Sequence, residues 1–208
     1  LARPLLADPE FVVKAAAGAP EQINTCIACN QACLDHVFEG KPAGCLVNPR
    51  ACAETELNFN KVSKSKKIAV IGAGPAGITF AIHAAERGHD IHLFEKEAEI
   101  GGQFKLAANI PGKEEFKETL RYFAVQLKLN HVKVYLNTSF DFQSVGDQGF
   151  DEIVLAAGVK PKSISAIHGF NHPYEVSYAD LILGKVPKGN NVAIFGAGGV
   201  GFDVATFL

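Results

Sequence analysis

Methionine is absent from the 208-residue sequence, so Leu1 is not a natural start residue. We therefore expect the chain to be a piece of a longer protein, ending at Leu208 within the opening turns of a helix that begins near Val200. An excess of either charge is also absent, because 20 Lys and Arg residues stand against 22 Asp and Glu residues. That balance is not typical of a nucleic-acid-binding surface.

A long hydrophobic run is missing as well. No apolar stretch approaches the roughly 20 residues that span a bilayer, and no signal peptide opens the sequence. We therefore expect a cytoplasmic protein with no membrane partner. In a reducing compartment, clustered cysteines bind metals more often than they form disulfides.

Four of the five cysteines cluster in C-x2-C-x3-C-x11-C spacing: Cys26, Cys29, Cys33 and Cys45. Three thiolates within eight residues can wrap one face of a metal group, and a fourth from a distal loop can close the site. Thiolates bind iron–sulfur clusters and zinc alike. The second C-x2-C hook of many structural zinc sites is missing, which favours a cluster, but spacing alone leaves zinc open. Cys52 has no partner, and we interpret it as a core or surface residue.

A glycine-rich dinucleotide fingerprint, Gly72-x-Gly74-x-x-Gly77, follows the cysteines. A β-branched run predicts a strand over 67–71 before it, and a helix is expected over about 75–87 after it. The first glycine would permit a tight turn, the second the approach of a pyrophosphate, and the third close packing of the helix. This context makes the fingerprint a strong indication of a bound dinucleotide.

Glu95 ends a second predicted strand, over 90–94, where a carboxylate can accept hydrogen bonds from a ribose diol. The Gly101-Gly102-Gln103 turn after it contains small residues that could admit a ligand close to the backbone. An ordinary loop explains this turn equally well.

A second fingerprint, Gly196-x-Gly198-x-x-Gly201, follows a predicted strand over 191–195. Two fingerprints suggest two nucleotides, a tightly held flavin and a diffusible nicotinamide. The residue that would separate NAD from NADP should lie beyond Leu208.

The remaining pattern predicts an α/β fold. A helix with Asp8 as N-cap and Gly18 as its stop is expected near the N-terminus. Further elements are predicted as a helix over 114–129 and strands over 132–136 and 152–156. Alternating strands and helices favour a doubly wound, Rossmann-like parallel sheet, preceded by the cysteine-rich segment.

With these residues, the chain resembles the iron–sulfur flavoprotein family that includes the 2,4-dienoyl-CoA reductases and trimethylamine dehydrogenase. The resemblance covers essentially the whole chain. It is carried by the strings ARPLLAD (2–8), NTCIACNQACLD (24–35), CLVNPRAC (45–52), the first fingerprint (68–77), EIGGQF (99–104), PGKEEF (111–116), TLRYF (119–123) and the segment 192–203 with GAGGVGFD.

The resemblance implies a larger enzyme of fatty-acid β-oxidation. A TIM barrel would bind FMN and the acyl-CoA substrate, and a 4Fe-4S cluster would lie between the barrel and an FAD domain. Electrons would pass from NADP(H) through FAD and the cluster to FMN. The implied divisions are the barrel's terminal helix (1–20), a cluster segment (21–60), an incomplete FAD-binding domain (61–186) and the start of an NAD(P)H-binding domain (187–208).

The resemblance also implies roles for individual residues. The metal ligands would be Cys26, Cys29, Cys33 and Cys45. FAD contacts would come from the first fingerprint and from Ala76, Glu95, Gln103 and Arg121, with Phe140 a weaker candidate. Ala2 and Arg3 match the end of the barrel that holds the FMN phosphate, and Gly196, Gly198 and Gly201 match the NADPH fingerprint. No catalytic residue is assigned, because the family's proton donors would lie in the barrel, and the chain alone is expected to be inactive.

Other functions remain open at this point. The larger protein could be another enoate reductase or an amine dehydrogenase of the same architecture, because substrate choice would lie in the barrel. It could resemble the small subunit of glutamate synthase, which delivers electrons to a partner. A zinc-stabilised nucleotide-sensing module without enzymatic activity is the remaining alternative.

Overall fold

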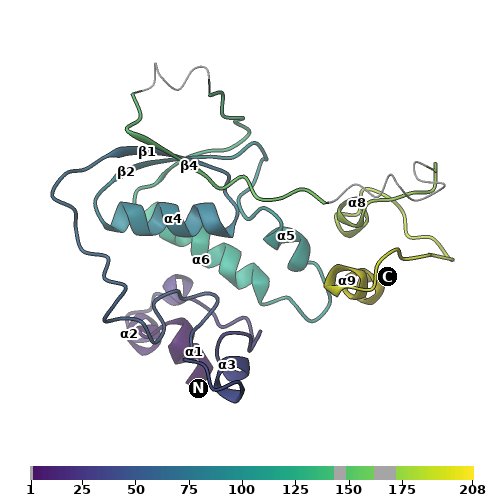
Figure 1. The fold of residues 1–208 in the computed structure, drawn as a ribbon, viewed down its shortest axis with the longest axis horizontal. Helices are drawn as coiled ribbons and strands as arrows, with labels where there is room; N and C mark the ends of the chain where they lie inside the picture. Colours follow the sequence, from purple (N-terminus) through teal and green to yellow (C-terminus); the bar gives the residue numbers. More distant parts are fainter. Residues whose placement is uncertain (1, 143–148, 162–171) are drawn as a thin grey trace.

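The structure of the chain is a computed structural model that describes residues 2–142, 149–161 and 172–208 (Figure 1). Its centre is a parallel sheet in the order β3-β2-β1-β4. The strands are β1 (Lys67–Ile71), β2 (Asp90–Phe94), β3 (Lys133–Tyr135) and β4 (Glu152–Leu155). The later strands flank β1 on both sides, so the predicted Rossmann-like α/β fold is confirmed.

Two helices, α4 (Pro75–Glu86) and α6 (Phe116–Leu129), lie on the same face of the sheet (Figure 1). Alternate residues of a strand point to opposite faces, and one set from β1 and β2 faces these helices. The resulting core buries Ile68, Val70, Ile91, Leu93, Ile78, Ile82, Phe123 and Leu127. This packing accounts for the long helices and the central strands that the sequence predicts.

The opposite face of the sheet carries aromatic side chains. Phe94 stacks on Tyr135 with ring centroids 4.8 Å apart, and Phe140 lies 4.9 Å from Phe94. His92, on the same face of β2, is buried and contacts Phe150 edge-on at 5.1 Å. The segment after β3 therefore covers this face with rings.

The N-terminal residues form several short helices instead of the single helix expected. α1 (Ala2–Ala7) and α2 (Phe11–Ala16) are separated at Asp8, whose Oδ1 accepts a hydrogen bond from the backbone N–H of Glu10 at 3.0 Å. The prediction of Asp8 as the N-cap was wrong, because Glu10 occupies that position. Gly18, at φ +69°, follows the end of α2 as expected.

The cysteine segment continues through η1 (Pro20–Gln22) and α3 (Leu34–Phe38), and α5 (Phe104–Ala107) follows the Gly101–Gly102 turn. Figure 1 shows the N-terminal helices beneath α6, on the side away from the sheet. The cysteine segment thus packs on the helical layer of the α/β unit.

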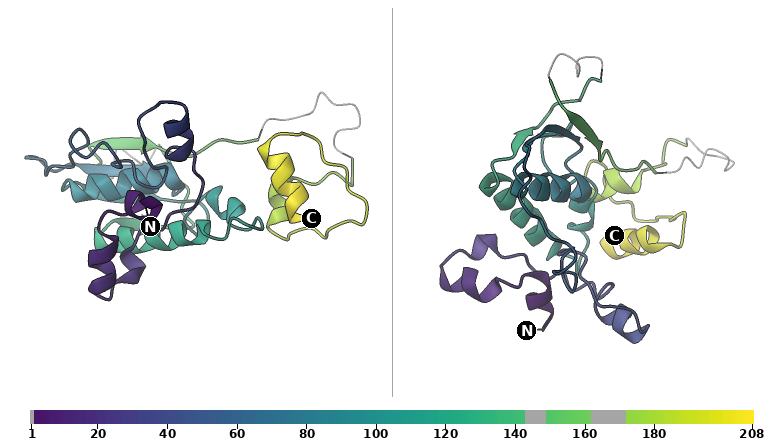
Figure 2. Two further views of the ribbon diagram at one scale, coloured as in Figure 1. Left: turned by 90° about the horizontal axis from the view of Figure 1, so that it is seen from below. Right: turned by 60° about the vertical axis from the view of Figure 1, so that its left-hand side comes forward.

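The C-terminal unit comprises α8 (Tyr178–Ile182) and α9 (Gly199–Phe207) and lies beside α5 (Figures 1 and 2). Its contact with the rest is small: Ile182 and Val204 bury against Ile110, and Lys113 pairs with Asp203 at 2.6 Å. The expected helix near Val200 is confirmed.

The strand predicted over 191–195 is not formed, which corrects the sequence-based expectation. A strand needs a neighbour for its backbone hydrogen bonds, and none of the described strands lies beside this segment. Its apolar side chains are exposed, with Phe195 77% accessible. Among the described residues, no helix combines the length and apolar character needed to cross a membrane.

Candidate functional site

The first fingerprint forms a turn that only glycine can occupy. Gly72 has φ +104°, and a Cβ there would lie 2.4 Å from the carbonyl oxygen of Ala156, just past the end of β4. A Cβ on Gly77 would lie 2.0 Å from the carbonyl oxygen of Gly72. The first and third glycines are therefore required to bring β1, β4 and the start of α4 together.

Gly74 has a different role. It is the N-cap of α4, and a Cβ built on it would meet no atom within 4 Å. Because packing does not require glycine here, the open space is the feature that a pyrophosphate would use. At the N-terminus of α4, the backbone N–H groups of the first turn and the positive end of the helix dipole would be available to a ligand in this space. Ala76 is exposed in the same first turn.

Glu95 lies directly beside this turn and is only 7% exposed. Its Oε2 accepts a hydrogen bond from the backbone N–H of Ala73 at 2.7 Å, and its Oε1 accepts one from Glu97 at 3.0 Å. These bonds fix the carboxylate at the end of β2 and leave further lone pairs for a ligand. The structure thus brings Glu95 and the fingerprint together, while the ribose contact itself stays a prediction.

The Gly101–Gly102 turn lies against the same loop. The N–H of Gly101 donates to the carbonyl of Ala73 at 2.7 Å, and a Cβ on Gly102 would lie 3.1 Å from the Cα of Gly74. Gln103, the N-cap of α5, follows at once and donates to the carbonyl of Val159 at 2.8 Å. Gln103 is therefore also at the edge of this site.

Arg121, a predicted FAD contact, faces the cysteine segment instead of the fingerprint. Its guanidinium donates to the carbonyl of Glu21, to the carbonyl of Ile23 at 2.9 Å and to Thr25 Oγ1 at 3.3 Å. The carboxylate of Glu118 accepts a hydrogen bond from the Nε of Arg121 at 2.7 Å. The side chain therefore joins α6 to the residues before the first cysteine, a contact that sequence reasoning missed.

Phe140, the weaker FAD candidate, belongs to the aromatic face of the sheet. Its ring contacts Phe94 and Phe142. Nearby, the N–H of Thr138 donates to the carbonyl of Glu95 at 2.8 Å. The segment that contains Phe140 is thus connected to the end of β2, and its predicted contact with FAD remains untested.

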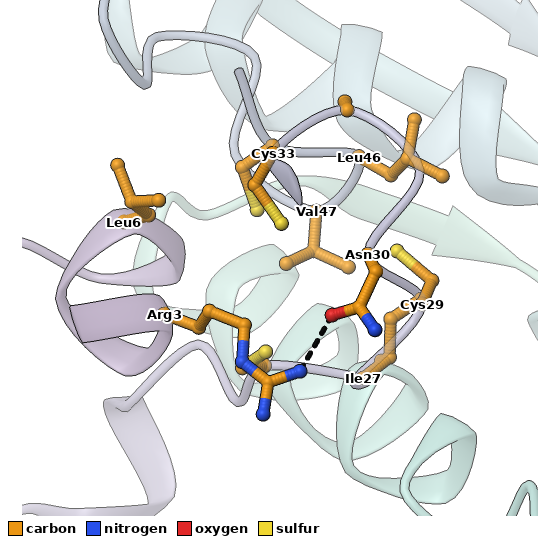
Figure 3. Close-up of a pocket in the computed structure, with 11 residues that line it drawn as sticks. Arg3, Leu6, Ile27, Cys29, Asn30, Cys33, Leu46 and Val47 are labelled. Carbon is orange, nitrogen blue, oxygen red and sulfur yellow. Dashed lines mark hydrogen bonds between the residues drawn. The ribbon is translucent and has the colours of Figure 1, made fainter. Parts of the chain in front are cut away.

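The four clustered cysteines line one pocket, as predicted from their spacing (Figure 3). All five cysteines are free, and Cys52 is exposed outside the pocket. The remaining lining is mostly apolar, from Leu6, Ile27, Ala32, Leu46 and Val47. Soft sulfur donors in an apolar setting are the environment that iron–sulfur clusters use.

Backbone N–H groups near the thiols interact with the sulfur atoms of Cys26 and Cys45. The N–H of Ala28 donates to Cys26 Sγ at 3.4 Å, and Ala28 and Asn30 hold left-handed φ angles of +56° and +60°. Burial raises the pKa of the Cys45 thiol, whereas the backbone N–H groups of Val47 and Asn48 oppose that rise in pKa. Such N–H groups stabilise negative charge on sulfur.

The donor set of the pocket fits an iron–sulfur cluster. Four cysteine thiols share one lining, and such a cluster is held by four thiolates. Structural zinc can use the same four thiolates, so the lining alone admits both groups. Within the described residues, no three His, Cys, Asp or Glu side chains are grouped so as to hold a single metal ion.

Ala2 and Arg3, matched by resemblance to an FMN phosphate site, lie on α1. Arg3 lines the cysteine pocket and donates from Nη1 to Asn30 Oδ1 at 2.5 Å (Figure 3). Both residues are exposed. Arg3 is thus next to the thiols, and the predicted phosphate contact of both residues stays a prediction.

The second fingerprint has the same turn as the first, but its first glycine does not pack on a neighbouring strand segment among the described residues. Gly196 has φ +114°, and a Cβ on Gly201 would lie 2.1 Å from the carbonyl oxygen of Gly196. A Cβ on Gly196 itself would meet nothing within 4 Å, and Gly198 is equally open. Residues 191–200 are all exposed.

Sequence reasoning missed two buried polar residues behind the thiols, Asp8 and Asn24, which are 3% and 5% exposed. Asn24 stands two positions before the first cysteine, and this closeness to the motif was the only signal available. Asp8 accepts from Asn24 N at 2.8 Å and pairs with Lys14 at 2.8 Å. Together they connect the N-terminal helices to the cysteine loop.

Comparisons with known proteins agree with this fold. A model of the pyridine nucleotide-disulphide oxidoreductase family matches residues 66–208. The metal reductase of Desulforamulus reducens is 40% identical over 213 residues, covering 100% of this chain and 32% of the relative. The bilirubin reductase of Mediterraneibacter gnavus is 33% identical over 208 residues, again covering 100% of this chain and 32% of the relative.

A solved complex of 2-naphthoyl-CoA reductase with 2-naphthoyl-CoA is similar over 99% of this chain, with a TM-score of 0.94 and 37% identity. This chain covers 31% of that one. The chain thus spans about a third of the length of the relatives it matches.

Proposed function

The chain belongs to the pyridine nucleotide-disulphide oxidoreductase family, and we propose that it is the electron-transfer part of an NAD(P)H-dependent flavin reductase with an iron–sulfur cluster. The observation that carries this proposal is the pocket lined by four thiols, on a segment that Arg121 ties to the α/β unit. A nucleotide fold without that pocket would support only a two-electron flavin enzyme.

The chain's residues would share the work as follows. The space at Gly74 and the N-terminus of α4 would hold the FAD pyrophosphate, and Glu95 would hold its ribose. Cys26, Cys29, Cys33 and Cys45 would ligate a 4Fe-4S cluster. A bound FAD would supply two-electron chemistry with a nicotinamide, and a bound cluster would supply one-electron transfer toward an FMN.

The remaining assignments follow the resemblance. The second fingerprint would bind NADP(H), and Ala76, Gln103, Arg121 and Phe140 would contact FAD. Ala2 and Arg3 would reach an FMN phosphate in a barrel outside this chain. A cytoplasmic setting would keep the five thiols reduced.

We further propose that the acceptor is a conjugated acyl-CoA thioester, with a 2,4-dienoyl-CoA as the expected substrate. The likeness to a 2-naphthoyl-CoA reductase supports a thioester, and an aromatic acyl-CoA is the second candidate. Relatives named for metal and bilirubin reduction support substrate choice by residues outside this third of the protein. NADPH oxidation by the intact protein with dienoyl-CoA, naphthoyl-CoA, cinnamate and bilirubin would separate these acceptors.

The cluster is tested by a matched pair of cysteine variants. In anaerobically isolated protein, Cys52→Ala should retain equal amounts of iron and acid-labile sulfide, because Cys52 lies outside the pocket. Cys45→Ala should lose most of both. Zinc in place of iron, or equal loss in the two variants, would overturn the cluster assignment.

A further inference from the structure

Cys45 reaches the pocket from a loop of its own. Eleven residues, including α3, separate it from Cys33. Its position relative to Cys26 must therefore be set by contacts between loops, because the chain between them is too long to define it. Those contacts are few and identifiable.

Asn24 supplies the contact that reaches the residues before Cys26. Its side-chain Nδ2 donates to the carbonyl of Val47 at 2.7 Å, and its backbone N–H donates to Asp8 Oδ2 at 2.8 Å. Asn24 lies two residues before Cys26, and Val47 two residues after Cys45. This hydrogen bond therefore joins the Cys45 loop to the start of the first cysteine loop.

The surroundings make this bond rigid. Asn48 Nδ2 donates to the carbonyl of Leu6 at 2.8 Å, which ties the same loop to α1. Asp8 also accepts from Lys14 and from the Glu10 N–H, so its carboxylate has little freedom. The anchor of Asn24 is thus a fixed one.

The other end of the Asn24 amide is unpaired. Its Oδ1 is buried without a hydrogen-bond partner among the described residues. An unpaired buried acceptor costs stability. A residue kept for folding alone would be better replaced by an apolar one, so its value must lie in the bond to Val47.

The Asn24 bond reaches Cys45 through a short stretch of chain. Val47 is two residues from Cys45, and both line the same pocket. On the other side of Cys45, the N–H of Gly44 donates to the carbonyl of Ala32 at 2.6 Å. Loss of the Asn24 bond would therefore release the loop on one side of Cys45, so that its sulfur could occupy more than one position.

We propose that Asn24 is a positioning residue, which holds the Cys45 loop against the first cysteine loop and so fixes the position of the Cys45 sulfur as a ligand of a cluster bound there. This inference rests on the proposed cluster site. Asn24 itself ligates nothing and acts only through Val47.

The test compares Asn24→Ala with Asn58→Ala in the intact protein, isolated anaerobically. Asn58 makes a similar side-chain bond, from Nδ2 to the Thr55 carbonyl at 2.9 Å, on the surface. Asn24→Ala should broaden the electron paramagnetic resonance signal of the reduced cluster, because Cys45 would ligate it from more than one position. Its iron should pass to a chelator about tenfold faster. Asn58→Ala should change neither.

Asn48→Ala separates the Asn24 bond from the other tie of the Cys45 loop. It removes the bond to Leu6 but leaves the Asn24–Val47 bond, so it should speed iron loss less than Asn24→Ala does. Equal rates of iron loss in the two variants would overturn a specific role for Asn24. An unchanged signal and chelation rate in Asn24→Ala would overturn the whole inference.

Two outcomes separate this inference from the function it rests on. Wild-type protein without iron would overturn both. If Asn24→Ala retains no iron while FAD binding and far-UV circular dichroism match wild type, the positioning role is supported, because only the loops have failed.

Discussion

The two glycine fingerprints share their spacing but differ in what lies behind them. Both first glycines have large positive φ, +104° at Gly72 and +114° at Gly196. Both third glycines pack on the first one's carbonyl, with Cβ approaches of 2.0 and 2.1 Å. Of the two first glycines, Gly72 alone packs on a neighbouring strand segment among the described residues, at Ala156. The turn is thus a local property, whereas its support is supplied by distant residues.

The strands before the two turns show the same difference. β1 pairs with β2 over its whole length and with β4 from Ile68 to Ile71, whereas residues 191–195 pair with no described strand. A β-branched run indicates that a segment can form a strand. Whether it does depends on a partner for its backbone.

The largest difference in stability between the two fingerprints is expected from Gly72→Ala. It combines strain at positive φ with a clash against the Ala156 backbone, and should lower the free energy of unfolding by about 4 kcal/mol. Gly196→Ala meets only the φ strain and should cost about 1 kcal/mol. Chemical denaturation of both variants checks this, and equal costs would contradict the role of Ala156.

A second, smaller effect concerns how each peripheral unit is attached. Arg121→Ala removes charged hydrogen bonds to the residues before Cys26 and should destabilise the attachment of the cysteine segment by about 2 kcal/mol. Hydrogen exchange at residues 21–29 should accelerate, with α4 unchanged. Exchange that is uniform across the chain would instead mean that the α/β unit depends on this clamp.

The C-terminal unit should respond more weakly. Lys113→Ala breaks its ion pair with Asp203, a half-exposed contact worth about 0.5 kcal/mol. Faster hydrogen exchange in α9, with a smaller difference at high salt, is the expected result. A loss as large as that of Arg121→Ala would show that the two attachments are equivalent.

The smallest effect is a pH dependence of stability that is confined to the α/β unit. Burial lowers the pKa of His92, and Lys133 and Lys67 lower it further, against Asp90, which raises it. The unfolded state then binds a proton more readily than the folded state near the ordinary pKa of about 6.5. The free energy of unfolding should therefore fall as pH drops from 7 through this range.

His92→Gln should flatten that slope between about pH 5 and 7, where Asp and Glu change charge little. Hydrogen exchange in α9 should not follow it. A slope that persists in the variant would assign the pH dependence to another group.

Sequence reasoning succeeded where short-range pattern and long-range packing agree. The 67–71 and 90–94 strands and the helix after Gly74 are flanked by turn glycines and bury alternating apolar residues, so both signals coincide. The helices α3, α5 and α8 were missed, because elements of four or five residues carry almost no periodicity. Tertiary contacts decide whether such turns form.

The candidate site likewise has a part that the sequence predicted and a part that it did not. The spacing of the four cysteines predicted that they would share a pocket, because the loops that carry the ligands of one metal group must lie near each other. Nothing in the sequence indicated that Arg121 would contact the cysteine segment, since its partners are backbone carbonyls with no side-chain signature. Such contacts can be found only in the folded chain.

Arg121 has a consequence for timing as well as stability. Electron tunnelling slows exponentially with separation, so thermal breathing between a donor and an acceptor makes the rate fluctuate. A planar guanidinium fork that engages the carbonyls of Glu21 and Ile23 would restrain motion between α6 and the cysteine segment along its own axis. The arginine would act as a spacer of fixed length, and the rate of transfer would depend on the fold and little on its vibrations.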